Sequence, residues 1–405
     1  MTTPHNKIRI AVIDSHPIQY RAPLWRMLAA HPDIDLKCLF YFAGGSSEPH
    51  HDEDFGQQIK WDIPLLEGYP YEIMLKKSDF HLTPKQEIAL ARAISKQIRN
   101  FIPDAVLMVG IKPFLLYTSI LALLRVRGTP LFFLGESNQE SRGNGARTPL
   151  NRMAWMVLLR QYSAVFCIGQ KNRLFLRHHG VPPARLFYAP YSVENERFQS
   201  GYRESLAKRK TMLADLALPA DSRGFIFCGK FTHKKRVREI LRAYAASSLA
   251  ASHHLIFVGS GPLEDDLRHM VQRQGLEKVR FLGFVNQSEM PRVYSLADFL
   301  ILVSDPTETW GLVVNEAMAC GLPCIVAESC GCAPDLIIPG RTGWRVPLDN
   351  HQALIQAMQE AASLSQEQYL SISLGARKHI SRYSFKHMVD GIAAAVHFVV
   401  NNSRL

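Results

Sequence analysis

Residues 299–326 read FLILVSDPTETWGLVVNEAMACGLPCIV. Phe299–Val303 and Pro323–Val326 are apolar runs of strand length, and Leu312–Ala319 between them has the composition of a helix that packs on a sheet. Parallel strands need a crossover connection, which is usually a helix, so this order predicts one strand–helix–strand unit of a parallel sheet. The stretch therefore indicates an α/β fold.

The same alternation of strands and helices fills most of the chain. In residues 224–298, strands are expected at Gly224–Cys228, His254–Val258 and Val279–Leu282, with helices at Arg236–Ala246, Leu263–Gln274 and Met290–Leu296. A separate run in the first 190 residues has strands at Ile8–Ile13, Leu36–Phe42, Ala105–Val109, Pro130–Leu134, Ala164–Ile168 and Arg185–Ala189, with helices at Tyr20–Ala30, Lys85–Phe101, Phe114–Arg125, Asn151–Arg160 and Lys171–His178. Two such runs predict two Rossmann-like, doubly wound domains.

A polar, charged stretch from Tyr191 to Ser222 separates the two runs. We place an N-terminal domain at residues 1–190 and a C-terminal domain at residues 200–382. Open parallel sheets bind ligands at the carboxyl ends of their strands. Two facing domains of this kind therefore predict a cleft between them.

The composition is that of a globular chain. It has 405 residues, 47% of them hydrophobic, and a formal net charge of +11. The most apolar run, Phe114–Leu124, is 11 residues long, whereas a bilayer span needs about 20. The N-terminus has no signal-peptide pattern and the cysteine count is odd, so we expect a cytoplasmic protein with free thiols. Cys320, Cys324, Cys330 and Cys332 lack the paired spacing of a zinc site, and no metal is expected there.

Two carboxylates flank the helix start within residues 299–326. Glu308 lies in the loop after the strand, and Glu316 lies inside the helix, about 7.5 Å along its axis from Gly311. The amides of Gly311, Leu312 and Val313 form a helix N-terminus, which is a ready anion site. One ligand can use all three features, with a sugar hydroxyl at Glu308, a diphosphate at the amides and a ribose at Glu316. As bare spacing, a loop acid and a solvated glutamate are the simpler interpretation.

The surrounding residues resemble retaining glycosyltransferases of family 4, which have the GT-B fold. The resemblance rests on the string ETWGLVVNEAMACGLP at 308–323, followed by GCAPD at 331–335 and GRTG at 340–343. It extends upstream to GKFTHKK at 229–235 and GSGP at 259–262, and more weakly to HPIQY at 16–20. It implies two facing Rossmann-like domains, a nucleotide-sugar site in the C-terminal domain and an acceptor site in the N-terminal domain. It also implies that a last helix, at about 383–405, crosses back to the first domain.

The resemblance implies roles for single residues. Glu316 would hold the ribose of the nucleotide, and Glu308 would face the donor sugar. Lys230 and Lys235 stand where the family has a basic pair for the diphosphate, but the usual Arg, four residues, Lys, Gly is here Lys230, four residues, Lys235, Arg236. Lysine keeps the positive charge and loses the bidentate geometry of arginine. A basic helix start in solvent is the alternative interpretation.

The remaining nucleotide contacts are also implied by resemblance. The glycine turns at Gly229, Gly259 and Gly261 would line the nucleotide pocket. The backbone of Phe284 and Val285 would meet the base, whose identity nothing in the sequence names.

The N-terminal domain offers fewer candidates. His16 follows the first strand and therefore faces the cleft, where it orients a donor phosphate or an acceptor hydroxyl; a packed or capping histidine is an equally good interpretation. Many relatives have a glycine-rich loop here, and this chain has His16-Pro17 instead. Many also carry a histidine near the donor sugar after a later strand, where this chain has Glu136 and Asn138 as candidates instead.

A basic window occupies residues 142–185. It has eight basic residues and no acidic one, and it contains the apolar stretch Met153–Leu159. Basic and apolar residues at helical spacing fit a membrane-surface patch; they also fit a core helix with a solvated basic rim, which we favour by default. The chain has no recognition-helix, zinc-finger or RNP-like motif, so nucleic acid is not an expected partner.

These observations and the resemblance predict a retaining glycosyltransferase of hexosyltransferase type. It would move a sugar from a nucleotide-sugar donor to a hydroxyl of a glycan or lipid-linked acceptor, in cell-surface polysaccharide or lipid-linked glycan assembly at the inner face of the membrane. No cofactor and no metal are expected, because lysines and helix amides stabilise the negative charge of the leaving group. The alternatives are a non-hydrolysing sugar-nucleotide 2-epimerase of the same fold and a non-catalytic sugar-nucleotide-binding protein.

Overall fold

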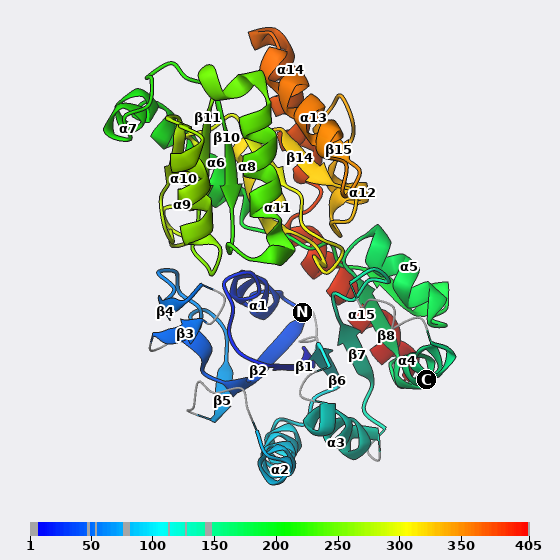
Figure 1. Cartoon of the computed structure of the whole chain (residues 1–405). Coiled ribbons are helices and arrows are strands. Elements are labelled where there is room, and N and C mark those ends of the chain that lie inside the picture. The colour runs from blue at the N-terminus through cyan, green and yellow to red at the C-terminus, as the bar shows by residue number, and fades with distance from the viewer. Residues whose placement is uncertain are drawn as a thin grey trace, which may run out of the picture.

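The computed structural model describes residues 7–46, 49–52, 55–75, 82–111, 114–125, 128–141 and 148–403. Its elements form two lobes, each built on its own sheet (Figure 1). The strands of each sheet pair in parallel throughout. The prediction of an α/β fold with two Rossmann-like domains is confirmed.

The N-terminal lobe has a seven-stranded sheet. Its order is β5 (Tyr71–Leu75), β2 (Ile34–Phe42), β1 (Ile8–Asp14), β6 (Ala105–Val109), β7 (Leu131–Leu134), β8 (Ala164–Cys167) and β9 (Leu186–Tyr188). The helices between these strands are α1 (Ala22–Ala29), α2 (Pro84–Phe101), α3 (Phe114–Arg125), α4 (Pro149–Leu159) and α5 (Gln170–His178). A separate antiparallel hairpin, β3 (His50–Asp52) and β4 (Gln57–Ile59), stands outside the sheet.

The C-terminal lobe has a six-stranded sheet. Its order is β12 (Val279–Phe281), β11 (His254–Val258), β10 (Gly224–Cys228), β13 (Phe299–Leu302), β14 (Cys324–Ala327) and β15 (Gly343–Val346). Its helices are α8 (Val237–Ala246), α9 (Glu264–Arg273), α10 (Met290–Tyr294), α11 (Leu312–Cys320), α12 (Ala333–Leu336), α13 (His351–Ser363) and α14 (Gln366–Ile380). Strands β10, β11, β13 and β14 are buried along their whole length, as expected for parallel strands covered on both faces.

The polar stretch between the lobes is more ordered than its composition suggests. It contains α6 (Asn195–Leu206) and α7 (Arg209–Asp215). Helix α6 buries only Phe198 and Tyr202, and it packs against α10 and α11 of the C-terminal lobe. Two buried side chains in twelve residues leave a mostly polar sequence, and this is why the pattern did not reveal a helix.

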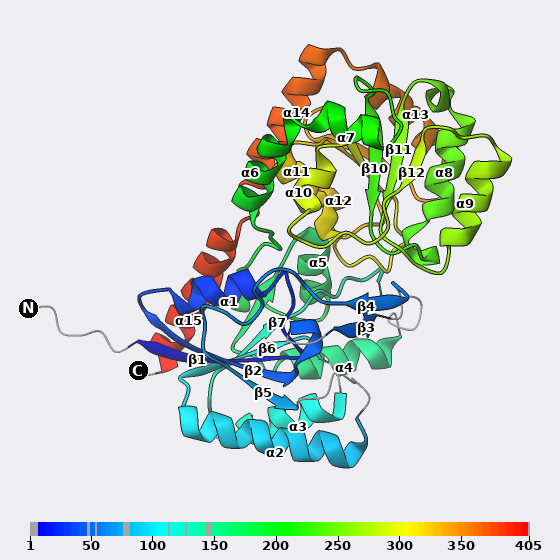
Figure 2. The ribbon, with the colours of Figure 1, turned by 90° about the vertical axis from the view of Figure 1, so that its left-hand side faces the viewer.

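The end of the chain returns to the first lobe. Helix α14 packs against α11, whereas α15 (Phe385–Ser403) packs against α1, β8 and β9. Figure 2 shows α15 running from the upper lobe down beside α1. Among the helices of the described ranges, none is both long and apolar enough to cross a bilayer.

Each sheet has one point where the winding reverses. In the first sheet β1 lies between β2 and β6, and in the second β10 lies between β11 and β13. At such a point the loops after two neighbouring strands turn to opposite faces of the sheet and leave a crevice at the carboxyl ends of the strands, where ligands bind. We therefore expect a site at these two crevices.

Candidate functional site

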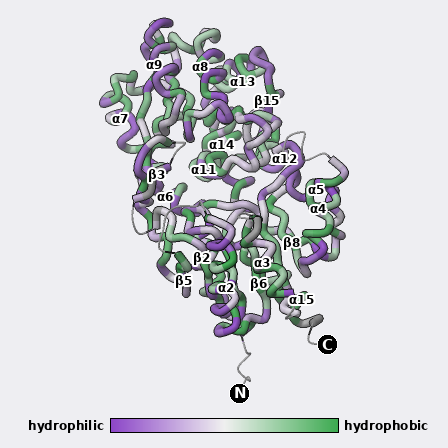
Figure 3. Tube along the Cα trace, turned by 60° about the horizontal axis from the view of Figure 1, so that its bottom comes forward, coloured by the Kyte–Doolittle hydropathy of each residue, from purple (hydrophilic) through white to green (hydrophobic). Residues whose placement is uncertain are grey.

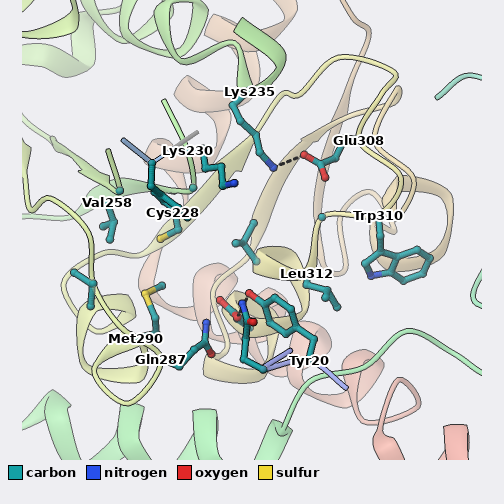
Figure 4. A pocket seen from close by; sticks show the side chains of 18 of the residues that line it. Tyr20, Cys228, Lys230, Lys235, Val258, Gln287, Met290, Glu308, Trp310 and Leu312 are labelled. Atoms are coloured by element: carbon teal, nitrogen blue, oxygen red, sulfur yellow. Dashed lines mark hydrogen bonds and ion pairs between the residues drawn. The ribbon is translucent and has the colours of Figure 1, made fainter. Parts of the chain in front are cut away.

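A cavity of about 320 Å³ lies where the two crevices meet. Residues from both lobes line it, and Figure 4 shows their side chains converging. The N-terminal lobe contributes Gln19, Tyr20, Phe55, Trp61, Glu136 and Tyr191, and the C-terminal lobe contributes Gly229, Lys230, Lys235, Gly259, Phe284, Val285, Glu308, Gly311, Leu312, Val313 and Glu316 among others. Most residues that the sequence predicted for the donor site thus line one cavity.

Helix α11 starts at the wall of this cavity. Gly311 has φ of +104°, which favours glycine, and a Cβ atom there would lie 2.6 Å from Leu302 Cδ2, so this buried side chain would have to shift. The first amides of a helix have no partner within it, and Leu312 and Val313 are the first two residues of α11. The cavity therefore meets the positive end of a helix dipole.

Glu308 lies in the loop between β13 and α11 and is buried. Lys235 Nζ donates a hydrogen bond to Glu308 Oε2, and Lys234 Nζ lies 3.9 Å from Oε1. Burial alone would raise the pKa of the Glu308 carboxyl, but the two lysines outweigh it and lower that pKa. Glu308 is therefore ionised at neutral pH, with Lys235 as its nearest cation.

Lys230 follows β10 and reaches across to the other lobe. Its Nζ donates to both carboxylate oxygens of Asp52, at 2.9 and 3.1 Å, and lies 5.0 Å from the ring centre of Phe55. Asp52 and Phe55 belong to the β3–β4 hairpin region, which the sequence did not reveal. Each lysine of the predicted basic pair is thus held by a carboxylate, one from each lobe.

Glu316 is the most deeply enclosed acid of the cavity. Its Oε1 accepts a hydrogen bond from the Tyr20 hydroxyl at 3.0 Å, and its Oε2 accepts one from the Tyr294 hydroxyl at 2.8 Å. Burial raises the pKa of Glu316, and the two hydroxyl hydrogen bonds partly offset that rise. Tyr20 comes from the N-terminal lobe, so this carboxylate also links the two domains.

The turns at Gly229 and Gly259 bring two segments of main chain close together. Gly259 has φ of +128°, and a Cβ atom there would lie 2.0 Å from the carbonyl oxygen of Gly229. Gly261 follows at φ of +152° and is not among the residues that line the cavity. Both Gly229 and Gly259 do line it, so a ligand there meets main chain rather than side chains.

Aromatic rings form one wall of the cavity, beside Lys230. Phe284 lies 5.2 Å from Phe55 and 6.2 Å from Trp61, measured between ring centres. Phe55 and Trp61 come from the N-terminal lobe and Phe284 from the loop after β12. This wall of the cavity offers aromatic side chains, the kind of side chain on which nucleobases stack.

A second, larger cavity of about 790 Å³ lies on the N-terminal side. His16 lines it, and the Ser15 hydroxyl lies 2.9 Å from His16 Nδ1. Much of the wall is apolar, formed by Phe42, Val109, Ile111, Leu134, Ile168 and Met388. Within the part of the chain that the structure describes, the charged groups that line it are Asp14, Arg21 and Glu136, with Arg21 Nε 2.8 Å from Asp14 Oδ2.

Among the described residues, three line both cavities: Glu136, Tyr191 and Thr309. The Tyr191 hydroxyl donates to Glu136 Oε1 at 2.5 Å, and the Thr309 hydroxyl donates to Oε2 at 3.4 Å. Asn138 lines neither cavity; its side chain accepts a hydrogen bond from the Ser141 amide at 2.7 Å, which shapes the local loop. Glu136 therefore stands at the junction, whereas Asn138 stabilises the loop behind it.

Comparison with known proteins finds a family similarity in the C-terminal half. Residues 208–379 match the glycosyl transferases group 1 family. The chain is 27% identical over 207 residues to N-acetyl-alpha-D-glucosaminyl L-malate synthase of Bacillus anthracis, covering 51% of each protein. It is 29% identical over 234 residues to D-inositol 3-phosphate glycosyltransferase of Saccharomonospora viridis, covering 55% of this chain and 52% of that protein. The matched part spans about half the length of these curated relatives.

Solved structures show the same fold over nearly the whole chain. A glycosyltransferase from Rickettsia africae superposes with a TM-score of 0.74 at 15% identity and covers 98% of this chain and 100% of its own. Anabaena HepE in complex with UDP and glucose gives 0.72 at 17% identity, covering 96% and 99%. At these identities the likeness establishes the GT-B architecture of the two lobes and nothing finer.

Proposed function

We propose that this protein is a retaining glycosyltransferase that takes its sugar from a nucleoside-diphosphate sugar. The observation that carries the proposal is the grouping of Lys235, Glu308, the first amides of α11 and Glu316 in one interdomain cavity. The grouping offers an anion site between two acceptors for hydroxyl groups, which suits a diphosphate between a sugar and a ribose. The match of residues 208–379 to a glycosyltransferase family supports the same conclusion.

The donor occupies the first cavity in this proposal. The ribose hydroxyls donate to Glu316, and the diphosphate takes the α11 amides with Lys230 and Lys235. The sugar then lies toward Glu308 and the junction with the second cavity. Lys230 and Lys235 exchange a carboxylate partner for phosphate oxygens, so their charge stays balanced before and after binding.

The acceptor occupies the second cavity. Its hydroxyl reaches the sugar past Glu136, Tyr191 and Thr309, the residues that both cavities share. A largely apolar wall suits a lipid-linked acceptor or a glycan on an apolar carrier. This fits a role in cell-surface polysaccharide or lipid-linked glycan assembly.

Transfer proceeds by attack of the acceptor oxygen on the anomeric carbon, from the face that the nucleoside diphosphate leaves. The carbon–oxygen bond to phosphate breaks, the new glycosidic bond forms, and the hydroxyl proton passes to the departing phosphate oxygen. Negative charge grows on that phosphate, and the lysines and the helix dipole stabilise it without a divalent cation. Chelation is therefore expected to leave transfer unchanged.

The test is a reaction of the protein with UDP-, GDP- and ADP-sugars in the presence of EDTA and polyprenyl-phosphate or glycan acceptors. We expect nucleoside diphosphate release that depends on the acceptor, and a product whose anomeric coupling in NMR matches the donor. Inversion of the anomeric centre would contradict the retaining mechanism. Isomerised sugar nucleotide without acceptor would show the epimerase alternative, and binding without turnover would show the non-catalytic alternative.

A further inference from the structure

Helix α4 carries an apolar stripe that the protein core does not use. Leu150, Met153 and Val157 are 72%, 57% and 55% exposed. On a helix with 3.6 residues per turn, these three positions lie within an arc of about 60°. Scattered exposed apolar residues are ordinary, but three on one face of an 11-residue helix form a continuous surface.

The opposite face of α4 explains its orientation. Trp155 and Leu159 are its buried residues, and the Trp155 ring packs 5.2 Å from the ring centre of Phe175 on α5. Arg152 Nε also donates to the carbonyl oxygen of His178 at 3.4 Å, which ties α4 to the end of α5. These core contacts therefore orient the apolar stripe of α4 toward solvent. The neighbouring helix α5 adds another exposed apolar side chain, Leu174, which is 70% exposed.

Exposed arginines accompany the apolar residues. Arg152, Arg160, Arg173 and Arg177 are exposed, and within the described ranges none of the four forms an ion pair with an acid. Residues 148–188, from before α4 to the end of β9, contain no Asp or Glu at all. The cations also repel one another: burial first and then Arg160 lower the pKa of Arg185. Lys171 of α5 is paired with Glu140, whereas the four exposed arginines are not balanced by an ion pair within the described residues.

We infer that the face formed by α4 and α5 docks on a lipid bilayer that carries anionic headgroups. Apolar side chains on a helix lying in the interface enter the acyl boundary, while flanking arginines meet the headgroup charge. Figure 3 shows α4 and α5 together at the outer edge of the N-terminal lobe, with hydrophobic and hydrophilic segments interleaved. A surface with both apolar and basic residues is complementary to an anionic bilayer. An apolar stripe alone would fit a protein partner equally well. The window residues Arg142 and Arg147 lie outside the described residues.

The docking face follows the second cavity along the chain. Leu134, Gly135, Glu136 and Ser137 line that cavity at the end of β7, and α4 is the next α-helix in the sequence. A bilayer bound at α4 therefore lies on the lobe that holds the largely apolar cavity. The inference does not depend on the proposed activity, because it concerns a surface outside both cavities.

The apolar part is tested by sedimentation with vesicles of phosphatidylcholine alone or mixed with phosphatidylglycerol. We expect the full chain to pellet with the anionic vesicles only, and Leu150→Ser with Val157→Ser to lower the partition coefficient about tenfold. The matched control is Leu370→Ser with Leu374→Ser, because these residues are 55% and 66% exposed and lie on α14, a helix of the C-terminal lobe. Thermal unfolding verifies that all variants fold.

The electrostatic part is tested by charge reversal. Arg173→Glu with Arg177→Glu is expected to abolish sedimentation with anionic vesicles, whereas Arg203→Glu with Lys208→Glu makes the same charge change near α6 and retains binding. Raised salt is expected to weaken binding. The inference would be overturned if the unmodified chain does not sediment with vesicles, or if the two charge-reversal variants lose binding equally. Self-association through α4 without lipid binding would overturn it as well.

Discussion

Replacing Lys235 with methionine removes the charge of this side chain and keeps a similar length, so it tests the role of the charge in ligand binding. Lys235 is 17% exposed and hydrogen-bonded to Glu308 in the first cavity, whereas neighbouring Lys234 is 40% exposed and 3.9 Å from the same carboxylate. If Lys235 holds the diphosphate, its loss removes one hydrogen bond between charged groups. Such a bond contributes about 1.5–3 kcal/mol net.

The dissociation constant changes tenfold for about every 1.4 kcal/mol. Lys235→Met is therefore expected to weaken UDP, GDP or ADP binding by about 10- to 100-fold. We expect a loss near the upper end of this range, because without Lys235 the carboxylate of Glu308 repels the phosphate. Lys234→Met removes a more exposed charge, which solvent screens, and is expected to weaken binding by only about threefold or less.

The assay is isothermal titration with each nucleoside diphosphate, in EDTA, on the unmodified chain and both variants. A further consequence concerns pH. Without Lys235, burial dominates and the pKa of Glu308 rises, so Lys235→Met is expected to regain part of its affinity as the pH falls and the carboxyl is protonated. Equal affinity in Lys235→Met and the unmodified chain, or an equal loss in Lys234→Met, would refute the reasoning.

Three further predictions concern stability. Tyr20→Phe removes the hydroxyl that reaches the carboxylate on α11 at 3.0 Å, and is expected to lower the free energy of unfolding by about 1–3 kcal/mol in urea titrations; Tyr71→Phe, at an exposed ring, is expected to change nothing. Burial raises the pKa of Asp335 to about 6, so the folded chain binds this proton more tightly than the unfolded chain, and the contribution of Asp335 to stability falls as the pH rises from about 4 to about 6. Asp335→Asn is expected to remove that slope from melting curves recorded across this range, and an unchanged slope would contradict it. Gly259→Ala is expected to destabilise far more than Gly275→Ala, since both have positive φ but only the first would place a Cβ atom 2.0 Å from a carbonyl oxygen; equal melting temperatures would count against the packing argument.

The local part of the site could be predicted from the sequence. Glu308, Gly311 and Glu316 belong to one strand–loop–helix unit, so their spacing along the chain fixes their positions in space. The same holds for Lys230 and Lys235, which follow β10 directly. These residues line one cavity because parallel strands end at the same edge of a sheet.

The contacts between the lobes could not be predicted in this way. Tyr20 meets Glu316 across 296 residues of chain, and Asp52 meets Lys230 across 178. No periodicity relates such pairs, because their approach depends on how two separate sheets pack together. Tyr20 had one sequence signal, its place in the loop after β1 beside His16, whereas Asp52 lies on a three-residue strand that is too short to give a pattern.

The central claim is that the interdomain cavity binds a nucleoside diphosphate without a metal. The most direct measurement is a thermal-shift panel of UDP, GDP, ADP and CMP with their sugars, each with and without EDTA, on the unmodified chain and on Lys230→Met with Lys235→Met. A ligand that binds only the folded chain raises the melting temperature. We expect one diphosphate type to raise it equally with and without EDTA, and the double variant to lose the shift. No shift with any nucleotide, or a shift that chelation abolishes, would contradict the account.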